Sequence, residues 1–214
     1  MKNTNTILFD LDGTLIDTNE LIISSFLYTL NRFFPDQYKL EDVLPFIGPP
    51  LEESFEKVAP EQVREMVDCY RKYNLENHDA LVKEFEGVKE TVAKLHERGY
   101  KLAIVSTKIH NVVIKGLELM GLKAYFDVIV ALDDVTKAKP DPEPIQLALT
   151  KLNSLPNEAV MIGDNHHDIL AGKNAGTKSI GVAWSAKGRD YLEHYEPDYM
   201  LDKMPDLLDL LGVE

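Results

Sequence analysis

Residues 6–15 read TILFDLDGTL, and this stretch decides how the chain is interpreted. A short apolar run, residues 7–9, is typical of a buried strand, and two acids, Asp10 and Asp12, follow it directly before Gly13. Side chains along an extended segment alternate between faces, so Asp10 and Asp12 point the same way. Neighbouring buried carboxylates repel each other and lose hydration, and a cation with oxygen ligands, such as Mg²⁺, would relieve both costs. The plainer alternative is an acidic turn, because Asp, Gly and Thr are common turn residues.

The rest of the chain divides into a helical segment and an alternating segment. From residue 18 to residue 83 the apolar residues recur at helical spacing, whereas from Gly87 onward strand and helix patterns alternate. This alternation predicts an α/β protein with a doubly wound parallel sheet and right-handed crossovers. We expect a core domain formed by residues 1–17 and 84–214 and an inserted helical cap domain formed by residues 18–83. Besides the first strand, the expected strands are residues 101–106, 126–132, 159–162, 179–183 and 198–201. The expected helices of the core are residues 88–98, 109–120, 144–152, 167–175 and 205–211, and those of the cap after its first helix are residues 41–47, 51–58 and 61–77.

Composition excludes several classes of partner. The formal net charge of -13 argues against nucleic acid and anionic membranes, but it permits an anionic small molecule where a few cations are concentrated. Cys69 is the only cysteine, so neither an intrachain disulfide nor a cysteine zinc site is expected. No apolar stretch approaches the length of a membrane span, and we expect a cytoplasmic protein.

Three more polar clusters follow predicted strands, where a doubly wound sheet binds its ligands. Ser106-Thr107-Lys108 offers hydroxyl and backbone N–H donors, although a Ser-Thr pair before a helix is also an ordinary N-cap. Lys139 lies in the proline-rich segment 137–144, which is stiff enough to aim a lysine; a solvated surface lysine is the alternative. Gly163-Asp164 repeats the acid at a strand end, and Asp168 follows one helical turn later.

Two adjacent histidines, His166 and His167, lie between those last two acids. Neighbouring residues on a helix do not share a face, so this pair is poorly suited to chelating one ion. We expect one of them to line the mouth of a pocket instead.

Taken together, the clusters resemble the haloacid dehalogenase superfamily of phosphotransferases. The matching segments occur in the family's order and span the whole chain; they are residues 10–14, Ser106, Lys139 and Gly163-Asp164 with Asp168. The resemblance implies a Rossmann-like α/β core with a helical cap and a Mg²⁺ cofactor. Because dehalogenating members are expected to lack the second aspartate, the presence of Asp12 implies a phosphatase or phosphomutase.

The resemblance also implies a role for each matching residue. Asp10 is the expected nucleophile and Asp12 the acid–base partner, while Ser106 and Lys139 bind the phosphoryl group in transfer. The expected metal ligands are the Asp10 carboxylate, the Asp12 backbone carbonyl and Asp164. Three further residues are expected to bind substrate: Thr14, Thr107 and Lys108. Two are expected to support the site: Gly163 and Asp168, the latter by orienting Lys139 or a metal-bound water.

A narrower resemblance concerns the substrate. Residues 46–50, 132–136 and 163–176 resemble a group of inorganic pyrophosphatases that are similar overall to phosphoglycolate phosphatases. This implies magnesium-dependent hydrolysis of pyrophosphate through an aspartyl-phosphate, including the pyrophosphate released when the serine-phosphorylated phosphocarrier protein HPr is dephosphorylated. Lys187 and Arg189 are additional candidate cations for such a substrate, or else solvated surface charges.

Other functions stay open at this point. One is a phosphomonoesterase for phosphoglycolate or another small phosphorylated metabolite, and another is a sugar phosphomutase. A third is a non-enzymatic protein whose acidic pocket binds magnesium or accepts phosphate as a signal. The joint presence of Asp12, Ser106 and Lys139 argues against the third, because a receiver needs no acid–base partner.

Overall fold

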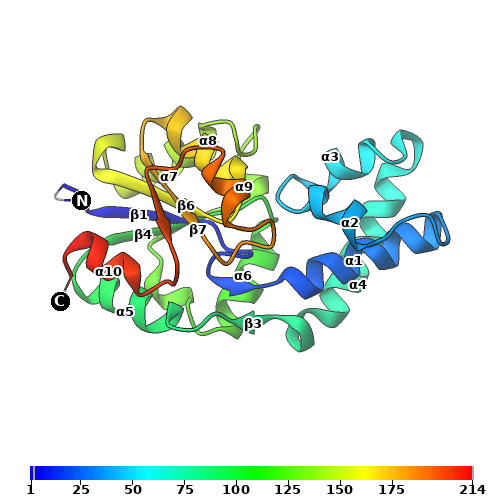
Figure 1. The fold of residues 1–214 in the computed structure, drawn as a ribbon, viewed down its shortest axis with the longest axis horizontal. Helices are drawn as coiled ribbons and strands as arrows, with labels where there is room; N and C mark the ends of the chain where they lie inside the picture. Colours follow the sequence, from blue (N-terminus) through cyan, green and yellow to red (C-terminus); the bar gives the residue numbers. More distant parts are fainter. Residues whose placement is uncertain (2, 214) are drawn as a thin grey trace. The chain divides into compact units, whose positions relative to one another are not determined.

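The computed structural model describes residue 1 and residues 3–213. The chain forms two compact units, which are drawn in Figure 1. Residues 1–16 and 84–214 make up the core unit, and residues 17–83 make up the helical unit. That the helical unit acts as a cap over a site stays a prediction.

The core unit is built on a six-stranded parallel sheet with the order β5-β4-β1-β6-β7-β8. The central strand β1 pairs with β4 on one side and with β6 on the other. The chain therefore steps outward from β1 to one edge and then from β6 to the other, which is the doubly wound arrangement that the sequence predicts. The strands are β1 (Thr6–Phe9), β4 (Lys101–Val105), β5 (Val128–Val130), β6 (Ala159–Gly163), β7 (Lys178–Val182) and β8 (Tyr199–Leu201).

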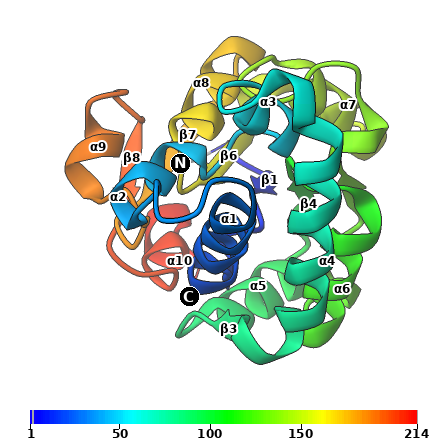
Figure 2. The ribbon, with the colours of Figure 1, turned by 90° about the vertical axis from the view of Figure 1, so that its right-hand side faces the viewer.

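Helices cover both faces of this sheet. Figures 1 and 2 show α7 and α8 on one face and α5, α6 and α10 on the other. Leu8, Ala103 and Met161 belong to a buried apolar cluster with residues of α7 and α8, while Phe9 contacts Phe126 edge-on, with ring centroids 6.1 Å apart. The helices of the core unit are α5 (Val88–Glu97), α6 (His110–Leu119), α7 (Glu143–Leu152), α8 (His166–Ala175), α9 (Arg189–Glu193) and α10 (Asp206–Leu211), with 3-10 turns η3 (Lys123–Tyr125), η4 (Leu132–Asp134) and η5 (Pro156–Glu158).

Two elements of the core unit differ from the prediction. The strand expected over residues 126–132 is limited to Val128–Val130, because the carboxylate of Asp134 accepts the backbone N–H of Ala131 at 2.8 Å and starts the turn η4. Helix α9 was not expected, since five residues are too few to display a helical period.

The helical unit has its own aromatic core. The ring of Phe26 lies 5.5 Å from those of Phe46 and Phe55 and 4.8 Å from that of Tyr70. The helix expected over residues 41–47 is divided into α2 and η1, because Pro45 has no N–H to continue an α-helix. The helix expected over residues 61–77 begins after the turn η2 and runs four residues further. The elements of this unit are α1 (Asn19–Phe33), α2 (Leu40–Val43), η1 (Leu44–Phe46), α3 (Leu51–Glu56), η2 (Pro60–Gln62) and α4 (Val63–Leu81).

A small two-stranded sheet marks the positions where the chain passes between the units. It consists of β2 (Ile16–Asp17) and β3 (Lys83–Glu84), two strands too short for a sequence pattern to indicate. Within the described residues, no helix has the length and apolar character needed to cross a membrane.

Candidate active site

Three buried carboxylates meet at the carboxyl ends of the two central strands. Asp10 directly follows β1 and Asp164 directly follows β6, and these strands are neighbours. Asp168 belongs to the first turn of α8. One side-chain oxygen from each of the three lies within 4.8 Å of the others. An all-oxygen set of this kind has the chemistry that Mg²⁺ prefers.

Lys139 is the cation within this acidic cluster. Its Nζ donates hydrogen bonds to Oδ1 of Asp10 at 2.8 Å, to Oδ1 of Asp168 at 2.6 Å and to the carbonyl oxygen of Val105 at 2.6 Å. The side chain of Lys139 is only 3% exposed, so solvent screens these contacts weakly. The sequence predicts that Asp168 orients Lys139 or a metal-bound water, and the structure places Asp168 and Lys139 in direct contact.

Local hydrogen bonds hold the segments that carry Lys139 and Asp168. The carboxylate of Glu143 accepts the backbone N–H groups of Thr136 and Lys137, at 2.8 and 3.0 Å, and thereby fixes the loop that leads to Lys139. Asp168 uses its second oxygen, Oδ2, to accept the backbone N–H of Asn165 at 3.0 Å. Asn165 is the N-cap of α8, and the two residues form a capping box that sets the direction of the Asp168 side chain.

Burial shapes the charge state of the cluster. Burial raises the pKa of Asp10 to about 7, although the ammonium of Lys139 acts in the opposite direction. Burial also raises the pKa of Asp164 well above its ordinary value, with the charge of Asp10 adding to the effect. Burial alone would lower the pKa of Lys139, but the carboxylates of Asp10 and Asp168 outweigh it and the pKa is raised. Three carboxylates therefore face one ammonium, and this deficit of positive charge fits a bound divalent cation.

Two glycines make room for these acids. Gly13 has φ +74°, and a Cβ at this position would run into the carboxylate of Asp164. A Cβ at Gly163 would likewise collide with the side chain of Asp168. The sequence predicts Gly163 as a supporting residue. That Gly13 must lack a Cβ follows only from the position of Asp164 in the fold.

The remaining predicted residues line the turn after β1 and the end of β4. Ser106 is buried, and its Oγ accepts the backbone N–H of Lys108 at 3.2 Å. Lys108, which the sequence predicts to bind substrate, donates from Nζ to Oδ1 of Asp12 at 2.6 Å. Oδ2 of Asp12 and Oγ1 of Thr14 are buried and have no hydrogen-bond partner among the described residues. Contacts of Ser106, Thr107, Lys108 and Thr14 with a substrate stay predictions.

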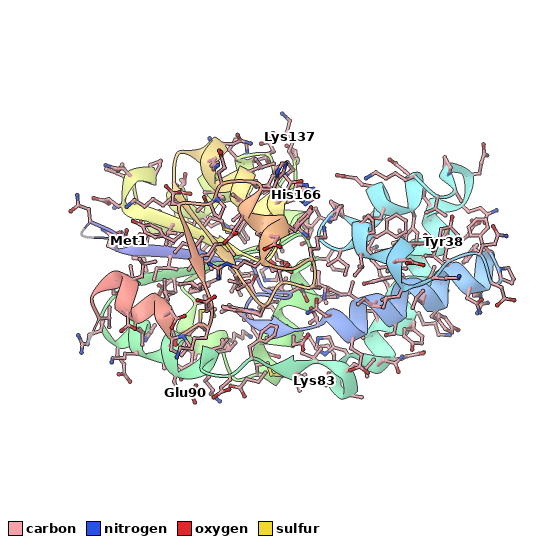
Figure 3. The ribbon with its side chains drawn as sticks, in the orientation of Figure 1. Met1, Tyr38, Lys83, Glu90, Lys137 and His166 are labelled. Atoms are coloured by element: carbon pink, nitrogen blue, oxygen red, sulfur yellow. The ribbon has the colours of Figure 1, made fainter. Side chains whose placement is uncertain are left out.

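His166 faces aromatic neighbours, whereas Nδ1 of His167 lies 2.9 Å from Oδ1 of Asn165. Nδ1 of His166 lies 2.7 Å from the hydroxyl oxygen of Tyr191, and the His166 ring stacks on Tyr195 at 4.9 Å. Figure 3 shows His166 at the end of the core unit that lies away from Met1. Among the described residues, the cluster that could hold a metal ion consists of Asp10, Asp164 and Asp168, and it contains no histidine.

Sequence reasoning missed three parts of this site. The carbonyl of Val105 accepts from Lys139, and no sequence signal marks a backbone acceptor. The capping role of Asn165 is visible in principle, because an Asn followed three residues later by Asp is a helix-start pattern. Ser185 donates from Oγ to the carbonyl oxygen of Asp164 at 2.7 Å, a contact over 21 residues that only the fold reveals.

Comparison with known proteins agrees with this geometry. Residues 7–182 match the family described as "Haloacid dehalogenase-like hydrolase". The chain is 61% identical to Pyrophosphatase PpaX of Anoxybacillus flavithermus, over 99% of this chain and 98% of that protein. It is 59% identical to Pyrophosphatase PpaX of Bacillus mycoides, over 97% of each chain. A solved structure of a haloacid dehalogenase-like family hydrolase from Streptococcus pneumoniae superposes with a TM-score of 0.88 at 28% identity, covering 98% of this chain and 99% of that one.

Proposed function

Because the chain belongs to the haloacid dehalogenase-like hydrolase family, we propose that it hydrolyses inorganic pyrophosphate to phosphate through an aspartyl-phosphate on Asp10. The observation that carries the choice of substrate is the 61% identity, over nearly the whole chain, to a protein named Pyrophosphatase PpaX. The chemical step is supported by the buried carboxylate of Asp10. The buried ammonium of Lys139 bonds to Asp10 and also to Asp168, and it thereby holds Asp10 in place.

In the first half of the reaction, a carboxylate oxygen of Asp10 attacks one phosphorus atom of pyrophosphate and the bond from that phosphorus to the bridging oxygen breaks. Lys139 contacts Oδ1 of Asp10, which keeps the carboxylate at a fixed orientation for this attack. Asp12 gives its proton to the departing phosphate. In the second half, Asp12 takes a proton from the water that attacks the aspartyl-phosphate, and a second phosphate leaves.

One hydroxyl and one ammonium of the site stabilise the phosphoryl oxygens. Ser106 donates to the equatorial oxygens. Lys139, whose three N–H groups donate to Asp10, Asp168 and Val105, stabilises those oxygens through its positive charge while charge redistributes, which is the main demand of phosphoryl transfer. Mg²⁺ would be held by the carboxylates of Asp10 and Asp164 and by the backbone carbonyl of Asp12, and it would supply positive charge to the acids and to the phosphoryl group. Asp168 already uses both oxygens, toward Lys139 and Asn165, and is better placed to orient the lysine than to bind the metal.

The cellular setting is part of the same proposal. The sequence resemblance suggests that the pyrophosphate comes from dephosphorylation of serine-phosphorylated HPr, and a cytoplasmic location would match that source. The net charge of -13 is compatible with a small anionic substrate that is bound by local cations.

The test of this mechanism is turnover of magnesium pyrophosphate by the wild-type protein and by Asp10→Asn. The substitution keeps the shape of the side chain and removes the attacking charge, so the rate should fall by several orders of magnitude. Far-UV circular dichroism should show that the variant is folded, since it removes one of three crowded carboxylates. Retention of more than about a tenth of the wild-type rate would remove Asp10 from the nucleophile role.

A further inference from the structure

The loop between β7 and α9, residues 183–188, is fastened to the acidic cluster. Ser185 is buried, and its Oγ donates to the carbonyl oxygen of Asp164 at 2.7 Å and accepts the backbone N–H of Lys187 at 3.2 Å. The backbone N–H of Gly188 donates to the carbonyl oxygen of Ser185 at 2.9 Å and closes the turn. These hydrogen bonds fix the loop beside Asp164, and with it the backbone of Lys187.

The side chain of Lys187 is half-buried and rests on an aromatic ring. Its Nζ lies 5.2 Å from the ring centroid of Tyr191. The hydroxyl of Tyr191 in turn contacts His166, two residues after Asp164. An aromatic face holds an ammonium in place without neutralising its charge. Burial lowers the pKa of Lys187, and the carboxylates of Asp164 and Asp168 act against that shift.

Arg189, the first residue of α9, has its carboxylate partners outside the acidic cluster. Its Nε donates to Glu193 at 2.6 Å, and its Nη1 pairs with Asp202. The side chain is 41% exposed, and two carboxylates balance its single positive charge. The carboxylates that act on Arg189 are those of Glu193 and Asp202, whereas those that act on Lys187 are Asp164 and Asp168, so Lys187 is the cation whose charge acts on the acidic cluster.

We propose that Lys187 binds the departing phosphoryl group of pyrophosphate and thereby sets the preference for a diphosphate over an ester with an uncharged leaving group. The inference rests on the proposed function. Lys139 is already bonded to Asp10 and Asp168, at the position where the transferred phosphoryl group reacts. Lys108, the cation beside Asp12, is bonded to that carboxylate. Pyrophosphate carries negative charge on both phosphoryl groups, so a further cation stabilises the bound departing group. An ester such as p-nitrophenyl phosphate carries negative charge on one phosphoryl group only and gains little from it.

The first test compares two substrates in Lys187→Met. We expect kcat/KM for magnesium pyrophosphate to fall about 10- to 100-fold, the range for loss of a hydrogen bond to a charged group, while kcat/KM for p-nitrophenyl phosphate changes less than about threefold. Lys187→Arg keeps the positive charge and should retain most of the preference. Lys178→Met is the matched control, because Lys178 lies at the other end of β7 with its Nζ 5.9 Å from the ring centroid of Tyr199.

The second test measures binding without turnover. Trp184 is the only tryptophan of the chain and lies in the same loop, so its fluorescence reports on binding there. In an Asp10→Asn background, titration with magnesium pyrophosphate should give a Kd that Lys187→Met weakens at least about tenfold and Lys178→Met leaves unchanged.

The outcomes separate the inference from the proposed function. If the wild-type protein does not hydrolyse pyrophosphate, the proposed function fails first. If it does, two results would show that only the assignment of Lys187 is wrong. One is that Lys187→Met lowers kcat/KM equally for both substrates, and the other is that it leaves the Kd for magnesium pyrophosphate unchanged. Should Lys187→Met fail to fold, Lys187→Arg decides: loss of the preference in a folded arginine variant would overturn the assignment.

Discussion

Replacing Lys139 by methionine isolates the charge at the centre of the acidic cluster. Methionine is apolar and of similar length, so the main loss is the ammonium that bonds to Asp10, Asp168 and the carbonyl of Val105. The side chains of Lys139, Asp10 and Asp168 are 3%, 10% and 2% exposed, which leaves little water to take over the role of the lysine. Removal of one partner from a buried ion pair costs about 3–5 kcal/mol, and we expect the free energy of unfolding to fall by that amount at pH 8.

The loss should depend on pH. In the folded protein the pKa of Asp10 is about 7, against 3.8 for the unfolded chain, and removal of a neighbouring positive charge raises the folded value further. The folded state then holds a proton that the unfolded state has released, so stability falls as pH rises above 4. This fall extends to higher pH in Lys139→Met than in the wild type. At pH 5.5 the protonated Asp10 needs no counter-charge, and the destabilisation should be smaller than at pH 8.

The assay is urea unfolding followed by far-UV circular dichroism at pH 5.5 and pH 8 with chelator present, and Lys178→Met serves as the surface control. Equal destabilisation at the two pH values, or a loss below about 1 kcal/mol at pH 8, would refute the argument that Lys139 compensates buried negative charge.

Two further predictions concern the same cluster. Mg²⁺ should raise the melting temperature more at pH 8 than at pH 5. Burial raises the pKa values of Asp10 and Asp164, so protons compete with the cation at low pH. Thermal melts with and without Mg²⁺ measure this, and an equal shift of the melting temperature at both pH values would contradict it. Gly163→Ala should lower the free energy of unfolding by about 1–3 kcal/mol and reduce turnover, because the new Cβ displaces the side chain of Asp168 and with it Lys139. Urea titration and steady-state rates test the two effects. Wild-type stability and turnover in this variant would show that the site tolerates the methyl group.

The core of the fold was predictable because its signals are local. Short apolar runs, separated by helices of about ten residues, specify parallel strands, and the crossover rule then places their carboxyl ends along one edge. Asp10 and Asp164 follow two such runs directly, so the sequence alone predicts that they lie close together. The two-residue strands β2 and β3 and the short helix α9 were missed because no periodic pattern fits in so few residues.

The partners within the site were less predictable, since they depend on how loops bring distant residues together. Nothing in the sequence states that Lys108 pairs with Asp12, 96 residues away, or that Ser185 bonds to the backbone of Asp164. The sequence marks Lys139 by its proline-rich segment, but it leaves open whether Lys187 is a substrate-binding cation or a surface charge. Only the tertiary structure places the first between two carboxylates and the second on an aromatic ring.

The measurement that tests the central claim most directly is kcat/KM for magnesium pyrophosphate and for phosphoglycolate, determined side by side with the wild-type protein. A site built from buried acids and a few cations recognises charge, and pyrophosphate is small and highly charged, so we predict the higher value for pyrophosphate. If kcat/KM were about tenfold or more higher for phosphoglycolate, a difference of about 1.4 kcal/mol in transition-state binding, the assignment to pyrophosphate would be wrong. The protein would then still be a phosphatase of this family.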